Sequence, residues 1–208
     1  MLYWFGKIVV VPFFWLIFRP VIRNRKGLRS QGAVMYLCNH FSLADAVALA
    51  AVSPRVIRFM ALEKLFVKPI PRAFFKSLYM LPAGEEGGSR LGPVKRAIAL
   101  LNEGYAFGIF PEGHRSPVYT EMDAFEKGAA FIALRANVPI IPIYMDPLSW
   151  KRMRLRMTVG ERIVPAEVKA ECPGQKPVDA LTDRIVDTLN TLRAETEEMI
   201  PLRQRRRI

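Results

Sequence analysis

The chain has few of the residues that build disulfide frameworks and metal sites. Its 208 residues include two cysteines, Cys38 and Cys172, and two histidines, His40 and His114. Two cysteines are too few for a disulfide framework, and they fit a reducing compartment. No cysteine–histidine cluster has the spacing of metal ligands. We therefore expect a chain without a metal site.

Acidic residues are scarce relative to basic ones. The chain has 31 lysines and arginines against 19 aspartates and glutamates, which gives a formal net charge of +12. Such an excess favours an anionic partner, which could be a nucleic acid, an acidic membrane surface or a phosphorylated substrate. No nucleic-acid motif with interleaved aromatic residues is visible, so we expect no nucleic-acid partner. The arginine-rich residues 203–207 keep open a non-enzymatic protein that binds membranes or nucleic acid.

Charge is nearly absent from the first 18 residues, where Lys7 is the single exception. A spanning helix needs about 20 apolar residues, so this segment is marginal. A signal peptide would carry its basic residues before the apolar run, but here Arg19 and four further basic residues follow it. We therefore expect a membrane-associated helical segment over residues 1–24, on the cytoplasmic face of the cell membrane, followed by one domain over residues 25–208. The alternative is a buried N-terminal helix.

The rest of the chain lacks repeats and low-complexity tracts, and short apolar runs alternate with segments of helical spacing. We expect strands at residues 33–38, 56–61, 78–82, 105–110, 138–144 and 155–159. We expect helices at residues 42–52, 92–104, 124–135 and 178–192. The alternation predicts an α/β fold with a mixed, largely parallel sheet flanked by helices. Prolines within residues 138–144 suggest a strand end or a sheet edge.

Two expected strands are followed by polar corners, and sites in such sheets form outside the carboxyl ends of strands. The first corner holds His40 and Asp45. A histidine that titrates near neutral pH can remove a proton from a hydroxyl as that oxygen attacks a carbonyl. A nearby carboxylate would fix the ring tautomer and stabilise the imidazolium. Five positions apart, the two side chains would lie on different faces of a helix, so a strand-to-helix corner must bring them together.

Other interpretations of this corner stay open. The pattern from Ser42 to Asp45 matches a capping box that opens the next helix, so Asp45 could serve only as a cap. His40 could simply end a strand. Cys38, two positions before His40 on the same face of a strand, could instead be a nucleophile that forms an acyl-enzyme.

The second corner is Phe110–Ser116, and it carries Arg115 in a loop bounded by proline and glycine. The planar guanidinium suits a phosphate, and backbone N–H groups of a glycine-containing turn could assist. Lys127 could add further positive charge. The alternative is a surface ion pair between Arg115 and Glu112 of little energetic consequence.

Four blocks together resemble the glycerolipid acyltransferase family, of the 1-acylglycerol-3-phosphate acyltransferase kind. That family has a His-four-residues-Asp block, here at residues 40–45, and a Phe-Pro-Glu-Gly-Thr-Arg-Ser block, here at 110–116 with His114 in the threonine place. A Phe-Lys-x-Gly-Ala-Ala block is matched in part at 125–130, and a Val-Pro-Ile-Val-Pro block corresponds to 138–142. The order and the separations agree.

The resemblance implies transfer of a fatty acyl group from acyl-CoA or acyl carrier protein to the free hydroxyl of 1-acylglycerol-3-phosphate, which yields phosphatidic acid. His40 would be the general base and Asp45 would orient it, with no metal, cofactor or covalent intermediate. The implied acceptor site comprises Glu112, Gly113, Arg115, Ser116 and Lys127. The implied acyl-binding region comprises Val138, Pro139, Ile140 and Pro142. Membrane lipids would be partners of such an enzyme.

The chain departs from the family pattern where acceptor recognition is expected. Glu85 occupies the place of an arginine, and a carboxylate repels a phosphate. Arg90 or Arg96 could substitute for it. A lysine common after the second strand also looks replaced, with Lys64 offset from its place. These departures keep open the same chemistry on another lysolipid acceptor.

Overall fold

The computed structural model describes residues 2–42, 44–61, 63–82, 91–112 and 125–201. Its centre is a seven-stranded sheet with the strand order β1-β7-β6-β2-β5-β3-β4. The strands are β1 (Val21–Arg23), β2 (Val34–Cys38), β3 (Ile57–Ala61), β4 (Leu81–Pro82), β5 (Ala106–Ile109), β6 (Ile140–Met145) and β7 (Arg156–Val159). Strand β2 pairs in parallel with β5 and β6, and β3 pairs in parallel with β5 and β4. Strand β7 runs antiparallel to β6, so the expected mixed, largely parallel sheet is confirmed.

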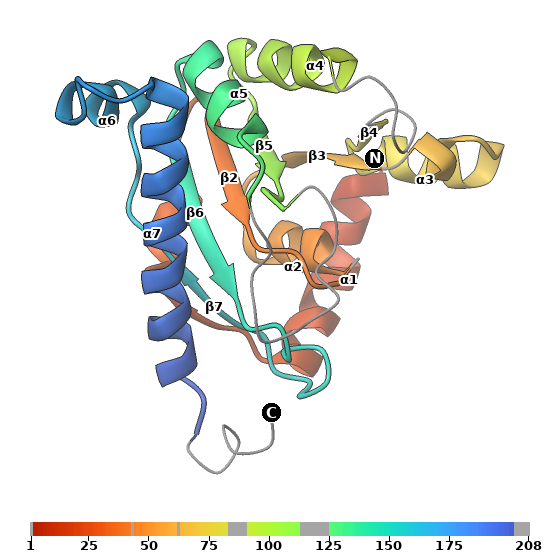
Figure 1. The fold of residues 1–208 in the computed structure, drawn as a ribbon. Helices are drawn as coiled ribbons and strands as arrows, with labels where there is room; N and C mark the ends of the chain where they lie inside the picture. The colour runs from red at the N-terminus through yellow and green to blue at the C-terminus, as the bar shows by residue number, and fades with distance from the viewer. Residues whose placement is uncertain (1, 43, 62, 83–90, 113–124, 202–208) are drawn as a thin grey trace.

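Helices cover both faces of this sheet (Figure 1). They are α1 (Leu2–Phe18), α2 (Asp45–Val52), α3 (Pro69–Ser77), α4 (Leu91–Asn102), α5 (Gly128–Ala136), α6 (Pro165–Glu171) and α7 (Pro177–Glu198), with 3-10 turns at Arg25–Arg29 and Glu63–Phe66. Alternate residues of β2 separate two cores. Met35 and Leu37 pack with α4, α5 and α7, whereas Val34, Tyr36 and Cys38 face α1 and α2. Because β2 is buried on both faces, its sequence is apolar throughout.

The apolar stripe of α7 fastens this helix to the sheet. Leu181, Ile185, Leu189 and Leu192 are buried, as their spacing of three and four predicts. Burying each such side chain stabilises the fold by about 1.5–3 kcal/mol. Helix α7 therefore holds β6 and β7 in place.

Helix α1 packs against α2 on one side and is apolar on the other. Phe14 is buried in the core, and the Lys7 ammonium turns inward to donate to the Ser53 carbonyl at the end of α2. Burial lowers the pKa of Lys7. Trp4, Ile8, Phe13, Leu16 and Ile17 are exposed. None of the helices in the described ranges is long and apolar enough to cross a bilayer.

Two details differ from expectation. Pro139 stands at the expected strand end, directly before β6, but β6 is not at a sheet edge, because it lies between β7 and β2. It tolerates Pro142 because the ladder with β7 begins at Ile143, and Pro142 is joined to the residue after β7 through its carbonyl oxygen, which accepts the Gly160 N–H at 2.8 Å. Strand β1 joins the sheet beside β7, although residues 1–24 are expected to form the N-terminal segment. Three residues give too little periodicity to predict such a strand.

Candidate active site

The corner after β2 is fixed by a buried amide side chain. Asn39 is 1% exposed, and its Nδ2 donates to the Met145 carbonyl oxygen at 2.9 Å. The Met145 N–H in turn donates to Asn39 Oδ1 at 2.8 Å. The two bonds extend the β2–β6 pairing by one side chain, at the edge where the carboxyl ends of the parallel strands meet. They determine where His40 leaves the sheet.

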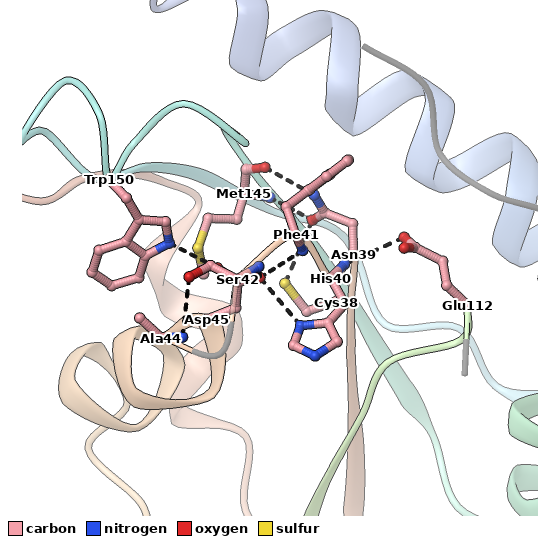
Figure 2. Close-up of polar contacts among 10 residues, drawn as sticks. All are labelled: Cys38, Asn39, His40, Phe41, Ser42, Ala44, Asp45, Glu112, Met145 and Trp150. Atoms are coloured by element: carbon pink, nitrogen blue, oxygen red, sulfur yellow. Dashed lines mark hydrogen bonds and ion pairs between the residues drawn. The ribbon is translucent and has the colours of Figure 1, made fainter. Parts of the chain in front are cut away.

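The strand-to-helix corner brings His40 and Asp45 together. His40 Nδ1 lies 3.2 Å from Asp45 Oδ2 (Figure 2). The same oxygen accepts the backbone N–H groups of Phe41 at 2.8 Å and Ser42 at 2.7 Å. The other oxygen, Oδ1, accepts the indole N–H of Trp150 at 2.9 Å. A carboxylate that is 3% exposed is thus supplied with donors on both oxygens.

Only half of the capping box expected from Ser42 forms: Asp45 Oδ2 accepts the Ser42 N–H, but Ser42 Oγ does not accept the N–H of Asp45. Helix α2 begins at Asp45, with Ala44 as the preceding residue, so Ser42 lies outside the helix. Ser42 Oγ instead accepts the N–H of Ala44 at 3.2 Å within the turn. The physical reason is that the Asp45 carboxylate folds back onto the turn and closes it by accepting the N–H groups of Phe41 and Ser42, so the helix begins only at Asp45.

The imidazole is held by stacking as well as by its hydrogen bond. Its ring centroid lies 4.0 Å from that of Phe110 at an interplanar angle of 18°, and Phe110 stacks in turn on Phe59 at 6.0 Å. The second ring nitrogen points away from Asp45 (Figure 2). When Nδ1–H donates to the carboxylate, the lone pair is on Nε2. The arrangement can therefore accept a proton at Nε2 and place the resulting charge beside a carboxylate.

Glu112 joins the second corner to the first. It is 1% exposed, and its Oε1 accepts the backbone N–H of His40 at 3.3 Å (Figure 2). The Glu112 carboxylate is therefore not at the surface, because it is buried against the turn that carries His40. Gly113, His114, Arg115 and Ser116 lie outside the described residues, as do Glu85 and Arg90.

Cys38 is an unsuitable nucleophile in this setting. Its side chain is fully buried, with Sγ 3.5 Å from Asn39 Oδ1. Burial raises the pKa of the Cys38 thiol well above its usual value, and the negative charges of Asp45 and Glu112 raise it further. The nucleophilic form of a cysteine is the thiolate, and this environment opposes it.

The other expected site residues lie in different surroundings. The exposed Lys127 Nζ lies 2.7 Å from Asp179 of α7, and this partner raises the pKa of Lys127. Residues 138–142 are buried at the amino-terminal end of β6, where Val138 and Ile140 pack in the core beneath α5 and α7. The dyad of His40 and Asp45 lies at the opposite, carboxyl-terminal end of the neighbouring strand β2. No group of three or more potential metal ligands occurs in the described part of the chain.

Three residues of this site carry roles that sequence reasoning did not assign. Asn39 fixes the corner, Phe110 stacks on the imidazole, and Trp150 donates to the carboxylate. A polar residue directly after an apolar strand was an available signal for Asn39, and the position of Phe110 at the end of β5 was one for Phe110. Trp150 is 105 positions from Asp45 in sequence, and no local pattern connects them.

Comparison with known proteins identifies one protein family, and its match spans more than half of the chain. Residues 19–146 match the model of the family described as Acyltransferase. A 1-acyl-sn-glycerol-3-phosphate acyltransferase of Bacillus subtilis is 26% identical over 186 residues, which cover 86% of this chain and 90% of that protein. A protein of the same name from Cocos nucifera is 28% identical over 178 residues, 81% of this chain and 54% of that protein. The crystal structure of the 1-acyl-sn-glycerophosphate (LPA) acyltransferase PlsC from Thermotoga maritima superposes with a TM-score of 0.70 at 21% identity, and covers 95% of this chain and 77% of that one. At that identity the likeness shows the fold.

Proposed function

Because this chain belongs to the acyltransferase family, we propose that it moves a fatty acyl group from acyl-CoA or acyl carrier protein to the free hydroxyl of 1-acylglycerol-3-phosphate. The product would be phosphatidic acid. The names of the relatives from Bacillus subtilis and Cocos nucifera support this acceptor. The observation that carries the proposal is the contact between His40 and Asp45 at the carboxyl edge of the sheet, beside the buried carboxylate of Glu112.

In the proposed mechanism, Nε2 of His40 takes the proton of the acceptor hydroxyl as its oxygen attacks the thioester carbonyl. The tetrahedral intermediate then collapses, the carbon–sulfur bond breaks, and the leaving thiolate receives the proton from the imidazolium. Asp45 stabilises the imidazolium between these steps through the 3.2 Å contact with Nδ1. The stacked ring of Phe110 also favours a cation against its face. General-base catalysis of this kind contributes a factor of about 10²–10⁴.

Acceptor recognition in this proposal rests on the loop after β5. Arg115, with backbone groups at Gly113 and Ser116, would bind the phosphate. Glu85, which stands at the place of an arginine in the family pattern that the chain resembles, favours a second candidate acceptor, a lysolipid without a simple phosphomonoester.

We also propose that the enzyme works on the cytoplasmic face of the membrane in which its acceptor resides. Two apolar surfaces support this. One is the outer side of α1, and the other is the segment entering α3, where Val67 and Ile70 are 75% and 82% exposed. The neighbouring Lys68 and Arg72 are exposed as well, and such cations suit anionic headgroups. The α3 segment follows β3, whose carboxyl end lies at the same edge of the sheet as the dyad.

The proposal is tested by offering the purified protein labelled acyl-CoA and acyl carrier protein with a panel of lysolipids in detergent micelles, and identifying each product by mass. Labelled phosphatidic acid from 1-acylglycerol-3-phosphate is the expected result. Product from another lysolipid alone would move the function to the second acceptor. No product, together with salt-sensitive binding of nucleic acid or vesicles, would favour the non-enzymatic alternative.

A further inference from the structure

Trp150 reaches the dyad from the side opposite His40 (Figure 2). Its Nε1–H donates to Asp45 Oδ1 at 2.9 Å, whereas Phe41, Ser42 and the imidazole all meet Oδ2. With contacts on Oδ2 alone, the carboxylate could still rotate about the bond to its side-chain carbon. A donor on Oδ1 fixes the plane of the carboxylate, and therefore the direction in which Oδ2 faces Nδ1.

The same indole packs against the end of α1. Its ring lies edge-on to Phe18 at a centroid distance of 4.9 Å and an angle of 76°, and to Phe14 at 6.3 Å and 64°. The loop around Trp150 is tied to this end of α1 through the backbone, since Leu155 N–H donates to the Phe18 carbonyl at 2.9 Å. A displacement of the last turn of α1 would therefore move the indole.

Hydrogen bonds and an ion pair within the loop that carries Trp150 hold this loop in place. Asp146, which is 3% exposed, accepts the Leu148 N–H at 3.0 Å and lies 3.0 Å from the Arg152 guanidinium. The Arg154 N–H donates to the Ser149 carbonyl at 3.0 Å. These bonds hold the loop as a turn, so the position of the indole is determined by the fold.

We propose that Trp150 is a positioning residue for acyl transfer, which holds Asp45 in the orientation that supports His40 and couples that orientation to the seating of α1. This rests on the proposed function above. The indole acts through Asp45 and does not touch the reacting atoms, so its loss lowers kcat while leaving the binding of donor and acceptor unchanged. Helix α1 carries the apolar surface proposed to contact the membrane. The position of this helix against Trp150 therefore determines how Asp45 faces His40.

The test replaces Trp150 by Phe and, by incorporation of a non-natural residue, by 3-benzothienylalanine, which keeps the indole shape but has no N–H. In micelles, both variants are expected to lose about 10-fold or more in kcat, with KM values for acyl-CoA and lysolipid unchanged, since a hydrogen bond to a charged group is removed. Thermal melting shows whether each variant is folded. Tyr105→Phe, which removes a polar hydrogen from an exposed ring before β5, is the matched control and is expected to keep its kcat.

The coupling to α1 is tested with Phe18→Leu. This change is expected to lower kcat, and in combination with Trp150→Phe to add little further loss. Wild-type kcat in the benzothienylalanine variant would overturn the positioning role. A loss of kcat in the Phe18→Leu, Trp150→Phe double variant equal to the product of the two single losses would overturn the coupling. If the wild-type protein transfers no acyl group, the proposed function fails; if the wild type is active and position 150 is silent, only this inference fails.

Discussion

The position of Asp45 explains the spacing of five residues between His40 and Asp45. Its carboxylate closes the turn by accepting the Phe41 and Ser42 N–H groups, and the same oxygen meets the imidazole of His40. The carboxylate that closes the turn is therefore also the one that meets the imidazole. A five-residue spacing fits because the turn needs that length for its closing side chain to reach back to the end of β2.

Cys38 provides a prediction for a single residue. Its raised pKa keeps the thiol protonated near neutral pH, because both burial and the nearby carboxylates oppose a thiolate. Cys38→Ala is expected to retain turnover within about threefold, since no acyl-enzyme at this sulfur is required. Product formation measures the turnover. Mass spectrometry of acid-quenched wild-type protein tests the same point, and an acyl adduct on Cys38 would contradict the account.

Among helices and strands, those with a long or strongly apolar pattern are the ones that the sequence predicts. The stripe of α7 and the apolar run of β2 both lie where expected. Helix α3 was not predicted, because Pro69 and Pro71 indicate a loop, although proline is tolerated in the first turn of a helix. Strand β1 and helix α6 are short, and their pairing and packing partners lie far away in sequence.

The contact between β3 and β5 gives a prediction at this scale. A Cβ on Gly108 would lie 2.2 Å from the buried ring of Phe59. That ring stacks on Phe110, which stacks on His40. Gly108→Ala is therefore expected to cost about 1–3 kcal/mol in unfolding free energy and to lower kcat, because the overpacked ring displaces the stack.

Gly104→Ala does not serve as the control, since its backbone has a positive φ of 85°. Gly92→Ala serves as the control, because a Cβ at position 92 would meet no other group of the described residues within 4 Å. Chemical denaturation and turnover are measured for both variants. Equal stability and turnover for Gly108→Ala and Gly92→Ala would show that the ring stack does not support the imidazole.

Over the whole molecule, the basic excess and the two apolar surfaces on α1 and at α3 support the proposed contact with a membrane. Two paired changes are tested: Ile8→Ser with Leu16→Ser on α1, and Val67→Ser with Ile70→Ser around the start of α3. Each is expected to reduce flotation with anionic vesicles while leaving turnover in micelles largely intact. Leu91→Ser on α4 matches Leu16 in exposure, at 69%, and is expected to float like the wild type. Flotation that is unchanged in both paired variants would refute the proposed membrane surface.

The active-site corner could be predicted because its chemistry is local in sequence. His40 and Asp45 stand five positions apart, and Glu112 falls in a block of recognisable type. The indole contact and the Asn39–Met145 pair could not be predicted, since each joins positions more than 100 residues apart. Such contacts depend on the strand order of the sheet, which residue patterns do not reveal.

The central claim is that His40 removes the proton of an acceptor hydroxyl while Asp45 holds the imidazole. The most direct test is the turnover of His40→Ala protein that melts like the wild type. The account predicts a loss of about 10²–10⁴-fold, with Cys38→Ala active in the same assay. Near-normal turnover in folded His40→Ala protein would contradict it.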